Sequence, residues 1–175
     1  TPLITACASG CTTGGGTASL ITVTVRDGAG QPVQGATVVL SASGTGNTLT
    51  QPATTTNASG VATGTLSSTS TIDQKVVSAV AGGIGITQTA TVTVNAGPAA
   101  SLDFTTQQPT NTTAGVAINS GTGGVVVTAR DQFGNTATSF VSLLTMVLGA
   151  NPAGGVLSGT TTATAVLGVA AFPNL

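Results

Sequence analysis

The chain has very little charge of either sign. Its 175 residues include only three basic and four acidic ones, so charged residues make up 4 % of the sequence, against roughly 25 % in an average soluble protein. Nucleic-acid binding needs many Lys and Arg side chains to neutralise phosphates, and targeting to anionic lipids needs a basic cluster. We therefore expect no nucleic-acid partner and no electrostatic attachment to a membrane.

Histidine, tryptophan, tyrosine and glutamate are absent, and all four acids are Asp: Asp27, Asp73, Asp103 and Asp131. Without an imidazole, the chain cannot form a Ser-His-Asp or Cys-His arrangement. Zinc sites need His or several Cys, and the Asp residues are too far apart in sequence to suggest paired catalytic carboxylates. These absences predict a protein that is not an enzyme and that uses no cofactor.

The two cysteines, Cys7 and Cys11, lie four residues apart in the run TACASGC. Their spacing predicts a small local disulfide, formed in an oxidising compartment. Three alternatives are a bridge to a neighbouring chain, a metal site and a lipid attachment. Two thiolates alone make a poor metal site. Residues 3–7 resemble a lipoprotein cleavage box, but six residues precede the Cys and no apolar signal segment is present.

Long apolar runs are also missing. The nearest candidate, residues 76–94, is broken by Gly82-Gly83 and then alternates Thr with small apolar residues, which favours a hairpin over a membrane span. The sequence begins at Thr1 without Met, so we expect any secretion signal to have been removed or to lie outside it. We predict an extracellular or cell-surface location.

What the chain does contain is alternation with period two. In residues 21–26, ITVTVR, the Ile and Val side chains point to one side and Thr, Thr and Arg to the other; residues 90–94, ATVTV, repeat the pattern. Such alternation predicts strands with one buried and one solvated face. Gly, Asn, Pro and Ser clusters at short intervals between these runs indicate an all-β sandwich.

An internal repeat divides the chain. VTVRDGAG at residues 23–30 reappears as VTARDQFG at 127–134, and SGVAT at 59–63 is echoed by LGVAA at 167–171. The same module therefore occurs twice. We predict two modules, residues 1–97 and 98–175, joined by a short Pro-containing linker at 95–100.

The two copies are unequal in length. The first continues through residues 76–80 and 86–94, predicted as its last two strands, whereas the second ends at Leu175, just after its VAAF strand. We therefore expect the second sandwich to lack its last two strands. Either the sequence is a piece of a longer chain, or neighbouring subunits donate strands. The first explanation is preferred because a donor would have to provide both strands.

Residues 21–38, ITVTVRDGAGQPVQGATV, resemble the first group of bacterial Ig-like domains found in invasin- and intimin-type adhesins, and residues 59–63 fit a later strand of the same family. In the second module, DQFGN at 131–135 and GGVLSG at 154–159 are similar to related Ig-like repeats of large bacterial surface proteins. The resemblance implies tandem immunoglobulin-like β-sandwiches from the bacterial surface. It says less about function, because the same fold serves many proteins.

The repeated motif also has a physical reason. Asp27 and Asp131 end a strand and can accept backbone N–H bonds in the turn that follows, while Gly30 and Gly134 supply a conformation that a Cβ resists. A calcium site at these Asp residues is the alternative, but it needs six to eight oxygen ligands and each turn offers one carboxylate. Turn formation is the preferred interpretation.

The remaining charged and aromatic residues suggest no ligand pocket. Arg26 and Arg130 are predicted to lie on the solvent face beside the turn Asp residues, making weak exposed pairs or covering a sheet edge. Asp73 and Lys75 are expected to form a similar local pair just before a strand that starts at Val76. Phe104 and Phe172 are predicted core residues of the second module.

These observations predict a structural or adhesive module, a stalk or spacer whose partners are neighbouring Ig-like modules or subunits. One alternative is a filament subunit assembled by strand donation into the incomplete second module. Another is an accessory carbohydrate-binding module, but a chain without Trp or Tyr has little from which to build an aromatic platform. Surface glycans are a further expectation, on the many Thr and Ser or at the sequons that begin at Asn57 and Asn111.

Overall fold

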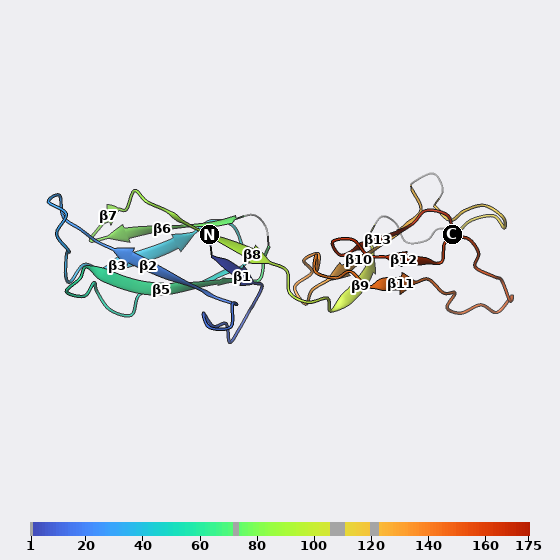
Figure 1. The fold of residues 1–175 in the computed structure, drawn as a ribbon, viewed down its shortest axis with the longest axis horizontal. Helices are drawn as coiled ribbons and strands as arrows, with labels where there is room; N and C mark the ends of the chain where they lie inside the picture. Colours follow the sequence, from blue (N-terminus) through green and yellow to red (C-terminus); the bar gives the residue numbers. More distant parts are fainter. Residues whose placement is uncertain (1, 72–73, 106–110, 120–122) are drawn as a thin grey trace. The chain divides into compact units, whose positions relative to one another are not determined.

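The computed structural model describes residues 2–71, 74–105, 111–119 and 123–175. Within these ranges the regular structure is all strand, with no helix, so the all-β prediction is confirmed (Figure 1). The chain divides into two compact units, Thr1–Asn95 and Ala96–Leu175, called here the N-terminal and C-terminal units.

The N-terminal unit consists of two sheets. One contains β2 (Ser19–Thr24), β5 (Val61–Ser68) and β4 (Asn47–Thr50), in the order β2-β5-β4. The other has the order β1-β8-β6-β3, with β7 paired to β6. Its strands are β1 (Leu3–Thr5), β3 (Val38–Ala42), β6 (Gln74–Ala81), β7 (Ile84–Gly85) and β8 (Ala90–Asn95). All pairs are antiparallel except β1 with β8, which is parallel.

The alternation seen in the sequence places the core of this unit. In β2, the Ile21 and Val23 side chains are buried and the Thr22 and Thr24 side chains are exposed. Side chains from both sheets fill the interior, as expected for two packed antiparallel sheets. The buried apolar residues of β2, β3, β5, β6 and β8 are Ile21, Val23, Val38, Leu40, Ala62, Leu66, Val77, Ala79, Ala81, Val92 and Val94.

Lys75 differs from its prediction. It lies inside β6 rather than before it, and its side chain is fully buried, with Nζ donating to the carbonyl oxygen of Thr45 at 3.0 Å. The period of the strand explains this, because Lys75 shares the inward face with Val77 and Ala79. The expected exposed position was therefore wrong. Its proposed partner Asp73 lies outside the described residues.

The C-terminal unit has two smaller sheets. One has the order β13-β10-β9, formed by β9 (Ser101–Phe104), β10 (Val125–Arg130) and β13 (Val169–Phe172). The other pairs β11 (Leu143–Thr145) with β12 (Thr162–Thr164). All of these pairings are antiparallel.

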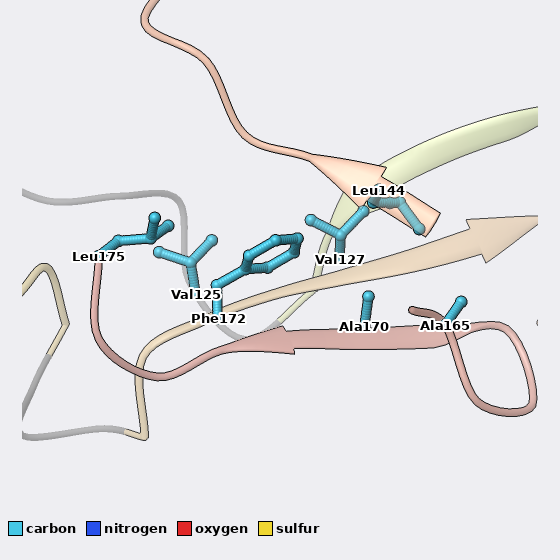
Figure 2. Packing of buried hydrophobic residues seen from close by; sticks show 7 residues of the cluster. All are labelled: Val125, Val127, Leu144, Ala165, Ala170, Phe172 and Leu175. Atoms are coloured by element: carbon cyan, nitrogen blue, oxygen red, sulfur yellow. The ribbon is translucent and has the colours of Figure 1, made fainter. Parts of the chain in front are cut away.

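The core of the C-terminal unit is small. Figure 2 shows the Phe172 ring lying beside Val125 and Val127 of β10, close to Leu144 of β11. Phe172 is completely buried, which confirms its predicted core position. Phe104, predicted to join it, is 44 % exposed. Phe104 is opposite buried Val127 and so shares the inner face of the sheet, but it lines an open groove together with Leu143 and Leu144 of β11. That core prediction was wrong.

Candidate functional surfaces

The first surface is the turn after β2, organised by the carboxylate of Asp27. Its Oδ1 accepts the backbone N–H groups of Ala29 at 2.9 Å and Gln31 at 2.8 Å. The Asp27 carbonyl accepts the N–H of Gly30, whose φ is +81°. Asp and Gly in these places are the residues that such a turn requires. No described residue donates a hydrogen bond to Oδ2 of Asp27.

The turn after β10 repeats this geometry around Asp131, with one addition. Oδ1 accepts the N–H groups of Phe133 and Asn135, both at 2.9 Å, and Gly134 takes φ +84°. Oδ2 accepts two more bonds at 2.9 Å, from the side-chain amide of Asn135 and from the backbone N–H of Gly97 in the linker. Asp131 is only 3 % exposed, whereas Asp27 is exposed.

The hydrogen bonds determine the ionisation of Asp131. Burial acts to raise the pKa of this carboxyl, but the bonds from the Asn135 side chain and from the backbone N–H groups of Gly97, Phe133 and Asn135 outweigh it. The pKa of Asp131 is therefore held below its ordinary value, because every one of these bonds favours the charged form. The linker before the C-terminal unit is thus held by an ionised side chain.

The arginines beside these turns do not bind the adjacent Asp residues. Arg26 Nη1 donates to the carbonyl of Gly30 at 2.9 Å. Arg130, whose side chain is half-buried, makes a long ion pair across the sheet to exposed Asp103, Nε to Oδ2 at 3.7 Å, and donates to Thr136 Oγ1 at 3.1 Å. Exposed pairs of this kind contribute little to stability.

A third turn of the same design follows at Asn57, where the sequence suggested only a glycosylation sequon. Asn57 Oδ1 accepts the N–H groups of Ser59 at 2.9 Å and Val61 at 3.0 Å. The carbonyl of Gly60 in this turn accepts the N–H of Val25, and the carbonyl of Gly168 accepts the N–H of Ala129 in the same way. The spacing Asn-x-x-Gly, parallel to Asp-x-x-Gly at 27–30, is the signal that could have identified it.

Cys7 and Cys11 are joined by a disulfide, with their Cα atoms 6.0 Å apart. The bridge closes a loop directly after β1. The N–H of Cys7 donates to the carbonyl of Ser68, and the N–H of Ala6 to that of Asn95. One backbone bond therefore joins Cys7 to the end of β5, and another joins the preceding residue to the end of β8.

The second surface is an apolar groove in the C-terminal unit. It has a volume of about 350 Å³ and lies between β9, which contributes Leu102 and Phe104, and β11, which contributes Leu143 and Leu144. Apart from β12, no described strand pairs with β11. The corresponding strand of the N-terminal unit, β3, pairs with β6. The groove therefore lies where the N-terminal unit has β6.

Exposed apolar side chains are concentrated in the same unit. Of the large hydrophobic residues that are exposed, most belong to the C-terminal unit, although it is the shorter of the two. They are Leu102, Phe104, Val116, Val141, Leu143, Val147, Leu148, Val156, Val166, Leu167 and Val169. So much uncovered apolar surface is typical of an interaction site or of an incompletely covered core.

Among the described residues, no group of three or more Cys and Asp side chains is placed to hold a metal ion. Nor do these ranges contain a helix with the length and apolar character needed to cross a bilayer.

Comparison with known families identifies the class of protein. Residues 4–95 match the bacterial Ig-like domain (group 1) family, which is more than half of the chain, and the chain belongs to that family. Ig-like domains of the adhesin type are typical of bacterial surface proteins, mediate protein–protein contacts and are generally not enzymes. No curated protein matches the chain.

Two solved structures are similar. InvD of Yersinia pseudotuberculosis is 26 % identical with a TM-score of 0.50, over 83 % of this chain and 40 % of that one. The adhesin InvE of Yersinia pseudotuberculosis is 23 % identical with a TM-score of 0.48, over 99 % of this chain and 49 % of that one. The chain therefore spans less than half the length of either structure. Family and fold together support an adhesive or structural module of a bacterial surface protein.

Proposed function

We propose that this chain is a non-enzymatic stalk or spacer segment of an extracellular bacterial surface protein, built from two Ig-like modules in series. The observation that carries the proposal is the bond between Gly97 N–H and Asp131. It fixes the linker to the C-terminal unit only two residues after Asn95, the last residue of β8. Only Ala96 lies between Asn95 and Gly97, so the connection between the two modules is short, which supports a serial arrangement.

The second module of this proposal is the C-terminal unit, completed by two more strands. The two units share the turn at the end of β2 and β10, together with the backbone bonds to Gly60 and Gly168. They differ on one side: among the described strands of the C-terminal unit, β11 pairs only with β12, and an apolar groove lies beside it where the N-terminal unit has β6 and β8. We expect sequence that follows in a longer protein to supply these strands.

A surface-display experiment tests the spacer function. One, two or three copies of the chain are inserted between a bacterial surface anchor and an epitope tag, on cells that carry a polysaccharide layer, and antibody access to the tag is measured. We expect access to increase with each copy. A Gly/Ser-rich insert of matched length is the control, and its access should increase less because coil dimensions grow only with the square root of length. Equal access at all copy numbers would refute the proposal.

The groove of the C-terminal unit favours one alternative, a filament subunit whose groove accepts strands from a neighbouring copy. Strand addition to an open edge is a known mode of assembly. The groove is lined mostly by apolar side chains, and the β11 edge beside it is unpaired among the described strands. This alternative predicts polymers of the purified chain, whereas the spacer function predicts a monomer.

A further inference from the structure

β2 of the N-terminal unit and β10 of the C-terminal unit are both followed by a turn built on an Asp, but only the Asp of the C-terminal unit is buried under another segment. In the C-terminal unit, Oδ2 of Asp131 accepts the N–H of Gly97 and the side chain is buried. In the N-terminal unit, Asp27 makes the same two Oδ1 bonds, yet its Oδ2 receives no bond from any described residue and the side chain is exposed. Oδ2 of Asp27 is thus an open acceptor, and the bond from Gly97 to Asp131 shows what kind of donor can occupy it.

The strand that leads to Asp27 is also open. In the C-terminal unit, β10 pairs with β13 on one side and β9 on the other, whereas β2 pairs only with β5 among the described strands. The N–H of Val25, the residue after β2, donates to the carbonyl of Gly60, the residue before β5. Because successive residues of an antiparallel strand face opposite edges, the N–H and C=O groups of Thr22 and Thr24 face the open side.

A groove lies beside this edge. It has a volume of about 260 Å³ and is lined by residues 21–24 of β2, Leu40 of β3, residues 77–79 of β6, Ile86 and residues 88–90. In the C-terminal unit the strand that covers the matching edge directs Leu102 and Phe104 to the inner face, because these residues are opposite Ala129 and Val127. The groove beside β2 is therefore where the same two side chains would enter the N-terminal unit.

We propose that the open edge of β2 and the carboxylate of Asp27 together bind the linker segment from another Ig-like module, in the way that residues 97–105 bind β10 and Asp131. Three donors set the spacing of the segment: Gly97 to Asp131 Oδ2, Ala100 to the carbonyl of Arg130 and Thr105 to the carbonyl of Val126. The matching acceptors here are Asp27, Arg26 and Thr22. This inference rests on the proposed function, since it assumes that modules follow one another in series.

The occupant is an extended linker rather than an unrelated peptide because the acceptors on Asp27, Arg26 and Thr22 have the same spacing as those that hold residues 97–105 in the C-terminal unit. A single N–H must reach the carboxylate beyond the end of the strand, and the ladder must begin three residues later. The chain's own copy of such a segment is already bound in the C-terminal unit. The segment that precedes β2, which contains β1, pairs with β8 instead.

The test extends the intact chain at its N-terminus with a copy of residues 97–105, GPAASLDFT, through a short Gly-Ser spacer. Hydrogen exchange of the Thr22 and Thr24 amides is measured by NMR, with far-UV circular dichroism to verify folding. We expect exchange of both amides to slow by roughly tenfold or more, because edge amides become ladder amides. A matched control extension, in which the copies of Leu102 and Phe104 are Ser, should leave exchange unchanged.

A third protein carries the full extension together with Asp27→Asn. The new amide side chain keeps Oδ1 for Ala29 and Gln31 but directs an NH₂ group at the linker N–H, so much of the protection should be lost. Unchanged exchange of Thr22 and Thr24 in the folded extended chain would overturn the proposal. Full protection retained in the Asp27→Asn variant would overturn the role assigned to the carboxylate. Epitope access in the display experiment is a separate readout, so either proposal can fail without the other.

Discussion

Replacing Asp131 by Asn is expected to destabilise the C-terminal unit far more than Asp27→Asn destabilises the N-terminal unit. In Asp131→Asn, Oδ1 keeps its bonds to Phe133 and Asn135, but an NH₂ group replaces Oδ2, which accepts both Gly97 N–H and the Asn135 side-chain amide. A buried donor left without an acceptor costs about 1–3 kcal/mol, and a bond to a charged acceptor is lost as well. We expect a total loss of about 2 kcal/mol.

Asp27→Asn is the matched control because it makes the same chemical change in the same turn. Oδ1 of Asp27 carries both described bonds and Oδ2 carries none from the described residues, so the cost should stay within about 0.5 kcal/mol. Differential scanning calorimetry is suitable because the chain has no Trp or Tyr for fluorescence. A loss of about 2 kcal/mol should lower the midpoint of a unit of about 80 residues by roughly 8–16 °C. Equal effects of the two substitutions would contradict the reasoning.

The pKa of Asp131 is lowered in the folded state. Its contribution to stability should therefore be fully present above the unfolded pKa of about 3.9 and be lost as the pH falls through the folded pKa. Calorimetry from about pH 6 to about pH 2 should show this loss in the unsubstituted chain but not in Asp131→Asn. Gly60 has φ +75°, and an added Cβ would meet the carbonyl of Val25, so Gly60→Ala should lower the free energy of unfolding by more than about 2 kcal/mol. Gly28→Ala is the control: its Cβ would meet open space, so the denaturation midpoint should change little. Reducing the Cys7–Cys11 bridge should cost at most about 2 kcal/mol, because it closes a very short loop, and circular dichroism should show the N-terminal unit still folded.

Much of the fold could be predicted because strands with one wet face show their period directly. Residues 21–24 of the predicted 21–26 strand lie in β2 and residues 90–94 lie in β8, and the repeated motif places a turn Asp at the same point of both units. The strand predicted at 86–94 is shorter than expected, since β8 begins only at Ala90. Lys75 and Phe104 were misplaced because burial depends on which neighbouring strand covers a side chain, and this is not a local property of sequence.

The site was predictable only in part for the same reason. The motif indicates that Asp131 forms a turn, but the bond from Gly97, 34 residues earlier, depends on how the linker returns to β10. The open edge of β2 likewise follows from the pairing of β1 with β8, which the Gly-rich first residues do not reveal. Only the comparison of the two units in three dimensions distinguishes a covered Asp from an open one.

The most direct test of the spacer function is the native mass of the purified chain, measured by light scattering after gentle size exclusion. We expect a single species at the monomer mass of 16.5 kDa, because a stalk segment acts within its own chain. A large, discrete polymer at the same concentration would contradict it and would identify the groove of the C-terminal unit as an assembly site.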